Sequence, residues 1–175
     1  QIKGAGDTTV YFNEMSVSES MAIDSTETNA QGKFSFKGNT EYPKFYQVAL
    51  SSNNFINLLI KPGEEIKLTA ESDNLTHYTI EGSPGSEKVK LLDQRLRLTK
   101  HKLDSLTGLY KNMEGLNASE EKLEKINEEY RRVLNDQRDS SIAFILDNMS
   151  SLASIMALYQ KVNPQTFVLY KNSDL

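Results

Sequence analysis

The stretch AIDSTETNAQGKFSFKG at residues 22–38 brings an acid and two hydroxyls together, as Asp24, Ser25 and Thr26. Such a cluster could be a reactive site, or it could lie at the edge of a β-strand, where these side chains hydrogen-bond loop amides. We favour the second interpretation, because the apolar residues around the cluster alternate as they do in a β-hairpin.

The two histidines and the paired glutamates are the other candidates for acid–base or metal chemistry. His77 falls in a strand pattern and His101 in a helical one, and neither has a carboxylate or a second histidine at a ligand spacing. Glutamates form adjacent pairs at 64–65, 120–121 and 128–129. Adjacent side chains on a strand or helix point in different directions, so these pairs are poorly placed to share a proton. We therefore predict no catalytic residue and no metal site.

Motifs for nucleotide binding or nucleophilic catalysis are absent from the sequence. The stretch GSPGSEK at residues 82–88 is superficially similar to a phosphate-binding loop, but it lacks the spacing of that motif. A capped junction between a strand and a helix explains it. The absence of cysteine excludes disulfides, thiol catalysis and cysteine-based metal sites for this chain. We predict no cofactor, and we do not expect the chain itself to be an enzyme.

Aromatic side chains interleave with polar ones in EYPKFYQ at residues 41–47. Tyr42, Phe45 and Tyr46 could line a face that binds a peptide or a glycan, because aromatic planes stack on such ligands. The other interpretation is a strand whose rings pack inward while its polar residues face water. Exposure of the rings in one groove would distinguish the two.

Composition indicates a globular protein, with 38% hydrophobic and 25% charged residues in a chain of 175. No apolar run approaches the roughly 18 residues that a membrane-spanning helix needs. The net charge is −4 and no basic stripe is present, so nucleic acid is not an expected partner. Residues 1–82 carry six basic and eleven acidic side chains, whereas residues 83–175 carry fourteen and thirteen. This asymmetry follows a change of expected structure at the same point.

Residues 1–82 have the pattern of short strands separated by turns. Ile23 and the pair Phe34 and Phe36 alternate with polar neighbours and are expected to face the core. Asn29–Gly32 would turn between their two strands. Short strands at this spacing indicate an antiparallel sandwich or a barrel-like sheet. The expected strands are Thr9–Met15, Ser20–Asp24, Lys33–Gly38, Lys44–Leu50, Phe55–Ile60, Glu65–Ala70 and His77–Gly82.

From residue 83 onward, apolar positions recur at the three- and four-residue steps of amphipathic helices. Ser83 or Ser86 can cap the first helix, Gly115 can end it, and Asn117 with Glu120 forms a capping box for the second. The expected apolar stripes are Leu92, Leu96, Thr99, Leu103, Leu106, Tyr110 and Met113, then Leu123, Ile126, Tyr130 and Val133, extended by Ile142, Ile145 and Met149.

The sequence therefore predicts an α+β protein with an antiparallel β domain at residues 1–82 and a helical region at residues 83–175. Two long helices would form an antiparallel hairpin, because a few residues join them. They are expected over about 86–114 and 118–149, with a shorter third helix over about 151–161.

A series of short motifs extends along nearly the whole chain: Ile2–Gly4, Val10–Phe12, Ile23–Ser25, Gly32–Gly38, Pro43, Pro62–Leu68, Ile80–Glu87 and Asp147–Ser154. In their order and spacing they resemble the N-terminal domain of unknown function that precedes the thioredoxin-like domain in TlpA-like thiol:disulfide interchange proteins (AhpC-TSA family) of Gram-negative anaerobes. In that family the redox chemistry belongs to the thioredoxin-like domain, so the resemblance assigns no catalytic residue to this chain. It implies that such a domain follows residue 175.

The resemblance also implies a context. The chain would be part of an exported protein, periplasmic or associated with the outer membrane, with a lipid anchor upstream as one route to the membrane. It would act as a non-catalytic interaction or positioning module, with the thioredoxin-like domain and a second copy of the chain as its expected partners. The alternative is an envelope peptide- or glycan-binding module that uses Tyr42, Phe45 and Tyr46.

One modification follows from this context. Asp24-Ser25-Thr26 and Asp104-Ser105-Leu106 resemble the three-residue acceptor for O-glycosylation of exported proteins in some such bacteria. Ser25 and Thr26 are the preferred candidates, because Ser105 lies on an expected helix.

Overall fold

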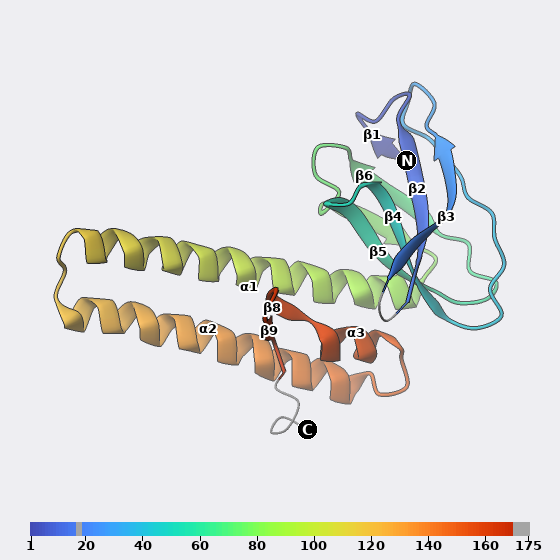
Figure 1. The fold of residues 1–175 in the computed structure, drawn as a ribbon. Helices are drawn as coiled ribbons and strands as arrows, with labels where there is room; N and C mark the ends of the chain where they lie inside the picture. Colours follow the sequence, from blue (N-terminus) through green and yellow to red (C-terminus); the bar gives the residue numbers. More distant parts are fainter. Residues whose placement is uncertain (17–18, 170–175) are drawn as a thin grey trace. The chain divides into compact units, whose positions relative to one another are not determined.

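The protein is an α+β protein, and a computed structural model describes residues 1–16 and 19–169 (Figure 1). The chain divides into two compact units, Gln1–Leu91 and Leu92–Leu175, which we call the β unit and the helical unit. The boundary lies inside the first helix, α1 (Pro84–Gly115), so the start of this helix belongs to the β unit.

The β unit contains two sheets around a common core. One has the strand order β1-β6-β7, the other β3-β2-β4-β5, and the described strands form no closed barrel. All pairings within these two sheets are antiparallel except β1 with β6. The strands are β1 (Ile2–Lys3), β2 (Thr9–Met15), β3 (Ser20–Glu27), β4 (Lys44–Ser51), β5 (Asn54–Ile60), β6 (Lys67–Glu71) and β7 (Tyr78–Glu81).

Period-two alternation builds the core of this unit. Tyr46 and Val48 on β4 lie opposite Leu58 and Ile56 on β5, and all four side chains are buried. Because successive residues of a strand point to opposite faces, this register puts the four on one face of the sheet. The second sheet contributes Ile2, Ala70, Tyr78 and Ile80 to the same core.

Two expectations for the β unit are wrong. Lys33–Gly38 is not a strand, and residues 34–40 make no backbone–backbone hydrogen bond to the rest of the described chain. Phe34 and Phe36 nevertheless pack against the core, as expected. Ile23 does not face the core: it is 46% exposed, because β3 is an edge strand whose side chains are almost all open to solvent. The predicted turn at Asn29–Gly32 is present, with the Gly32 amide donating to the Asn29 carbonyl over 2.8 Å.

Two buried serines fix the junction between the sheet and α1. The Ser86 hydroxyl accepts a hydrogen bond from the Leu59 amide at 3.0 Å, and the Ser83 hydroxyl accepts one from the Ser86 amide at 3.3 Å. Ser83 Oγ also lies 2.7 Å from a Glu64 carboxylate oxygen, which it satisfies as a donor. Gly82, at φ +86°, leads into this junction, and a Cβ there would overlap the Glu65 carbonyl oxygen. The GSPGSEK stretch is thus a structural junction, as expected.

The helical unit consists of most of α1, α2 (Glu120–Asp147), α3 (Ala153–Tyr159) and a small hairpin of β8 (Lys161–Asn163) and β9 (Thr166–Phe167) (Figure 1). None of the residues in the expected stripe on α1 is exposed: Leu92 and Leu103 are buried and the others are half-buried. Leu92 and Ile145 join Ala157, Val168 and Leu169 in a single core cluster. Met149 is the exception in the second stripe, at 76% exposed, because it lies beyond the end of α2.

The loop between the long helices differs from the sequence prediction. Asn117, not Gly115, adopts a positive φ (53°), which asparagine tolerates better than most residues. It therefore cannot be the N-cap of α2, which is Ser119, in an extended conformation. The predicted capping box of Asn117 and Glu120 is wrong, because the chain uses Asn117 to leave the first helix.

A buried polar group crosses the helical hairpin. The Thr99 hydroxyl donates to Gln137 Oε1 over 2.7 Å, and Gln137 Nε2 donates to the Ser141 hydroxyl over 3.3 Å. Gln137 and Ser141 are 2% and 1% exposed and occupy positions between Val133 and Ile145 in the stripe of α2. A polar side chain at such a depth is tolerated because it is hydrogen-bonded.

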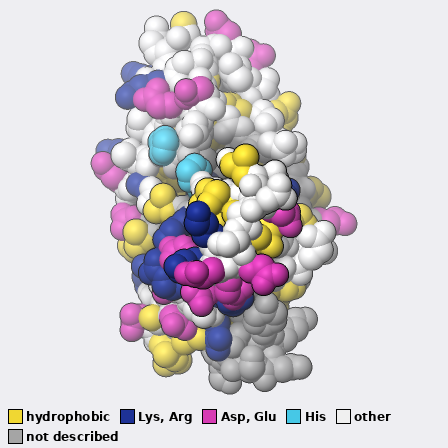
Figure 2. All heavy atoms as spheres, turned by 90° about the vertical axis from the view of Figure 1, so that its left-hand side faces the viewer, with side chains coloured by type: hydrophobic (Ala, Val, Ile, Leu, Met, Phe, Trp, Pro, Cys, Tyr) yellow, Lys and Arg dark blue, Asp and Glu magenta, His cyan; other side chains and the backbone are white. Residues whose placement is uncertain are grey.

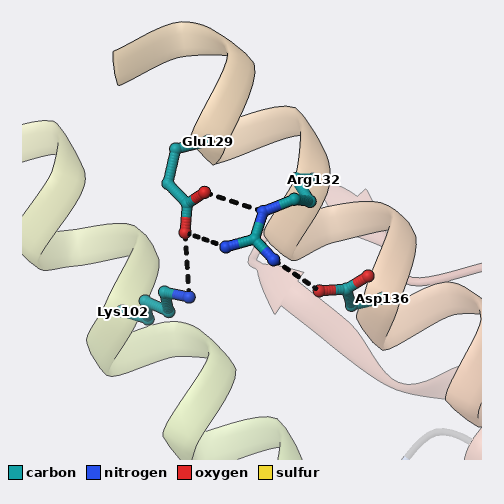
Figure 3. Close-up of polar contacts among 4 residues, drawn as sticks. All are labelled: Lys102, Glu129, Arg132 and Asp136. Atoms are coloured by element: carbon teal, nitrogen blue, oxygen red, sulfur yellow. Dashed lines mark hydrogen bonds and ion pairs between the residues drawn. The ribbon is translucent and has the colours of Figure 1, made fainter. Parts of the chain in front are cut away.

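A charged group links the same two helices nearer the loop. The Glu129 carboxylate of α2 lies 2.9 Å from Lys102 Nζ of α1 and 2.7 Å from the Arg132 guanidinium, which also approaches Asp136 at 3.9 Å (Figure 3). These contacts lower the pKa of Glu129, chiefly through the hydrogen bond from Arg132. Viewed from the side of this loop, basic and acidic side chains are interspersed (Figure 2).

Within the described residues, none of the helices combines the length and the apolar character that crossing a membrane requires.

Candidate functional site

The β unit contains a cavity of about 930 Å³, and every residue that lines it belongs to this unit. Cavities of roughly 300–1,000 Å³ are the usual size of small-ligand sites. Its walls are the inner faces of β2, β4 and β5, the segment 34–40 and the segment from Lys61 to Leu68.

Along the strands, the side chains that face this cavity change from apolar to charged. Phe12 of β2 lies opposite Val48 of β4, which lies opposite Ile56 of β5. Two residues along, on the same face, the row becomes Glu14, Tyr46 and Leu58, and the next pair is Lys44 with Ile60. Because same-face residues recur every second position, one end of the sheet supplies only apolar side chains and the other supplies a carboxylate and an ammonium group.

An aromatic wall lies on one side of the cavity. Phe12 stacks on Tyr46 with ring centroids 4.9 Å apart and on Phe36 at 5.1 Å. Phe34 meets Phe36 edge-on at 5.7 Å. Phe34 and Phe36 come from the segment 34–40, which we call the strap. Gly32 lies two residues before the strap, has a φ of +72°, and leaves no room for a Cβ, which would overlap the Ile2 carbonyl oxygen. The strap is thus held by its rings and not by ladder hydrogen bonds.

The polar end of the cavity holds one satisfied ion pair. Lys44 Nζ donates to Glu14 Oε1 over 2.7 Å, and both side chains are about one-third exposed. This hydrogen bond raises the pKa of Lys44. Glu64 is also engaged, because it accepts hydrogen bonds from the Lys61 amide at 3.0 Å and from Ser83.

The three aromatic residues proposed as a ligand face do not share one surface. Tyr42 is 58% exposed, with Lys44 Nζ 5.3 Å from its ring centroid, whereas Tyr46 is 6% exposed and belongs to the core. Phe45 is half-buried and, as the neighbour of Tyr46 on β4, points to the opposite side of the sheet. Of the three, only Tyr46 lines the cavity.

The hydroxyl cluster lies on the edge strand β3. Ser25 is exposed and Thr26 is half-buried. The Asp24 carboxylate accepts a hydrogen bond from the Ser25 amide at 2.8 Å, as expected for a side chain that binds nearby backbone. Ser105, the other candidate for glycosylation, donates its hydroxyl hydrogen to the His101 carbonyl one turn back on α1.

The other chemical candidates remain separate. His77 and His101 are both exposed, one in the turn before β7 and one on α1. Across residues 1–16 and 19–169, no group of three His, Asp or Glu side chains could hold a metal ion. Sequence reasoning missed the cavity and its basic residues. The signals in its direction were the inward-facing pair Phe34 and Phe36 and the choice of Tyr46 as a candidate ligand residue.

A family model described as "Domain of unknown function (DUF4369)" matches residues 1–89, which include every residue that lines the cavity. The matched region nearly coincides with the β unit. Comparison with curated proteins and with solved structures found no match. The chain therefore belongs to the DUF4369 family, a family of uncharacterised domains.

Proposed function

We propose that the chain is a non-catalytic binding module whose β unit receives an apolar group in the cavity. The observation that carries this proposal is the cavity of about 930 Å³, walled by Phe12, Phe36, Tyr46 and aliphatic side chains of β4 and β5. Burial of apolar surface would supply most of the binding free energy, at about 25 cal/mol per Å².

The proposal extends to the protein's context. On the sequence resemblance alone, we propose that the module accompanies a thioredoxin-like thiol:disulfide oxidoreductase domain in an exported protein and positions that domain or its substrate. The lack of cysteine in these 175 residues fits this division of labour, because thiol chemistry would then reside in the accompanying domain. Purified chain should therefore reduce no disulfide substrate, such as insulin, above the rate of the buffer. Turnover that survives repurification would contradict the proposal.

Binding is tested with a neutral fluorescent apolar probe, N-phenyl-1-naphthylamine, titrated into the full chain. We expect saturable binding of one probe per chain. Ile60→Trp, which adds bulk to a half-buried residue that lines the cavity, should weaken this binding at least several-fold. Leu98→Trp is the matched control, because Leu98 is 74% exposed on α1 and does not line the cavity.

Circular dichroism and the unfolding midpoint establish that both variants are folded. If Ile60→Trp does not fold, Lys67→Trp at the exposed start of β6 offers a second way to obstruct the cavity. Absence of probe binding to the wild-type chain, or equal binding by folded obstructed variants, would reject the proposal.

The alternative of a glycan- or peptide-binding aromatic face receives less support from the geometry. It would use Tyr42 and Phe45 without Tyr46, because Tyr46 is buried. Tyr42→Ala separates the two proposals, because it should leave probe binding in the cavity unchanged while abolishing any binding that depends on the exposed ring.

A further inference from the structure

The residues that line the cavity are mostly basic among their charged members, although the β unit as a whole is acidic. Residues 1–82 carry six basic and eleven acidic side chains. Four of the six basic side chains line the cavity, compared with three of the eleven acidic ones. The basic residues are Lys37, Lys44, Lys61 and Lys67, and the acidic residues are Glu14, Glu64 and Glu65. Most of the basic side chains of this acidic unit therefore line the cavity.

Four cations face three carboxylates in this lining, and one ion pair joins the two groups. Glu14 is paired with Lys44, and Glu64 accepts from Ser83 and from a backbone amide. Lys37, Lys61 and Lys67 are exposed and form no ion pair with any residue that the structure describes. Glu65 is the remaining carboxylate of the rim. Free ammonium groups beside an apolar chamber match a ligand with an anionic head and an apolar body.

The shape of the interior distinguishes between apolar bodies. Phe12 stacks on both Tyr46 and Phe36, and Phe34 and Phe36 meet edge to face. The rings of Phe12, Tyr46 and Phe36 thus stack on one another, whereas a bound sugar would need a free ring face. Apart from these rings, the apolar lining of the cavity is aliphatic, from Ile23, Val48, Leu58, Ile60, Ile66 and Leu68, and uncharged polar residues line it at Gln1, Ser35, Asn39 and Thr40. Such a surface suits a flexible hydrocarbon chain.

We propose that the cavity binds a long-chain carboxylate, a single-tailed amphipathic anion of the fatty-acid class. Its hydrocarbon tail packs against Phe12, Val48 and Leu58, and its carboxylate lies at the rim among Lys37, Lys61 and Lys67. This assignment rests on the proposed function, because it names the ligand class of the same cavity. The Glu14–Lys44 pair stands between the two regions and keeps its own charges balanced.

The first experiment compares three ligands of equal chain length as competitors of N-phenyl-1-naphthylamine: dodecanoate, dodecanol and dodecylammonium, each below its micellar concentration. Dodecanoate should bind more tightly than dodecanol, and dodecylammonium should bind most weakly. The preference for dodecanoate over dodecanol should shrink as ionic strength rises from about 0.01 M to 1 M, because the screening length falls from about 30 Å to 3 Å.

The second experiment varies the tail and the rim. Lengthening the carboxylate should improve affinity by about fourfold per methylene until the chamber is full. Replacing Lys37, Lys61 and Lys67 together by glutamine should reduce dodecanoate affinity by about 1.5- to 5-fold for each lysine and leave dodecanol affinity unchanged. The matched control is Lys100, Lys111 and Lys122 replaced by glutamine, which makes the same charge change on the long helices.

The outcomes separate this inference from the proposed function. Probe binding that is blocked by Ile60→Trp, but without preference for dodecanoate over dodecanol, would refute the carboxylate ligand and leave the binding module intact. An equal loss of affinity in the rim and control lysine variants would also refute it. No binding of any probe or amphiphile would reject both proposals.

Discussion

At the scale of single residues, some positions allow no other side chain without a loss of folding stability. At one of them a glycine is required, and at another a buried polar side chain is required. Gly82 and Gly63 both have a positive φ, but only Gly82 lies where a Cβ would meet another backbone segment. Gln137 is buried and hydrogen-bonded to Thr99, so it stabilises the folded state through this hydrogen bond as well as through its packing. These two kinds of position lead to two predictions.

Gly82→Ala should destabilise the β unit more than Gly63→Ala. Both alanines meet the same backbone strain, because φ is +86° and +78°. Only the first also overlaps the Glu65 carbonyl oxygen, whereas nothing lies within 4 Å of a Cβ at Gly63. The difference in unfolding free energy should be about 1–3 kcal/mol, the usual cost of overpacking. Urea titrations of both variants measure it, and equal midpoints would show that the junction accommodates a methyl group.

Gln137→Ala should destabilise the helical unit by about 2–4 kcal/mol, because it leaves a cavity and deprives the Thr99 hydroxyl of its acceptor. The double variant Thr99→Val with Gln137→Leu should lose less, since both partners of this hydrogen bond leave together and only the Ser141 hydroxyl loses its donor. A double-mutant cycle followed by urea unfolding gives the coupling. Additive losses would mean that the hydrogen bond contributes nothing to stability.

At the scale of elements, the sequence predicts those helices and strands whose apolar residues recur with a regular period. Strands β2 and β5 and all three helices are found close to their expected bounds, because their apolar residues recur at the period of the element. The strap fails as a strand although Phe34 and Phe36 face inward, because alternation reports an extended chain with one buried face and not its hydrogen-bond partners. Ile23 alternates equally well but lies on an edge strand, where it borders the cavity and stays 46% exposed.

The helix loop illustrates a second kind of miss. From the sequence, Asn117 could either cap the second helix or end the first, because asparagine favours both N-cap positions and a positive φ. Its use in the exit from α1 is decided by the path of the chain between the helices. Likewise, Gln137 interrupts an apolar stripe in the sequence, and only the approach of Thr99 from the facing helix makes its burial favourable.

The charged link between α1 and α2 predicts a pH dependence. The contacts with Arg132 and Lys102 hold the pKa of Glu129 below its ordinary value of 4.5. The carboxylate therefore stabilises the folded state above that value, and this stabilisation disappears as the pH falls through the lower folded pKa. Between about pH 6 and pH 3, the wild-type chain should lose more unfolding free energy than Glu129→Gln.

The control for this prediction is Glu121→Gln, which removes the same charge from α2 but from an ion pair with Lys125 inside that helix. This variant keeps the contacts of Glu129 with Arg132 and Lys102, so the loss of stability in acid that those contacts cause should remain. Parallel acid titrations of the wild-type chain and Glu129→Gln would contradict the assigned role of Glu129.

At the scale of the whole molecule, the family match and the cavity both belong to the β unit, and the buried polar group and the charged link both belong to the helical unit. The cavity could not be predicted from the sequence, because its walls come from segments as far apart as Phe12, Phe36 and Leu68. Its charge could not be predicted either, since the lysines that gather there are scattered along an acidic stretch.

This division predicts local responses to local changes. Amide hydrogen exchange should accelerate in α2 and in the part of α1 beyond Leu92 in Gln137→Ala, while β4 and β5 keep their protection. Dodecanoate should slow exchange in the strap and in β5 and leave α2 unchanged. Mass spectrometry of proteolytic fragments measures both effects. A change that spreads evenly over both units would show that they respond as one cooperative body.

The strap is a wall of the cavity whose sequence can change without disturbing either sheet. Two rings anchor it, and no ladder hydrogen bond ties its backbone to a neighbouring strand. Insertions, deletions and substitutions at Ser35 and from Lys37 to Thr40 can therefore accumulate without shifting the register of either sheet. Selection, or a protein engineer, can remodel one side of the binding chamber while the rest of the domain is inherited unchanged. We expect members of this family to diverge in this segment first.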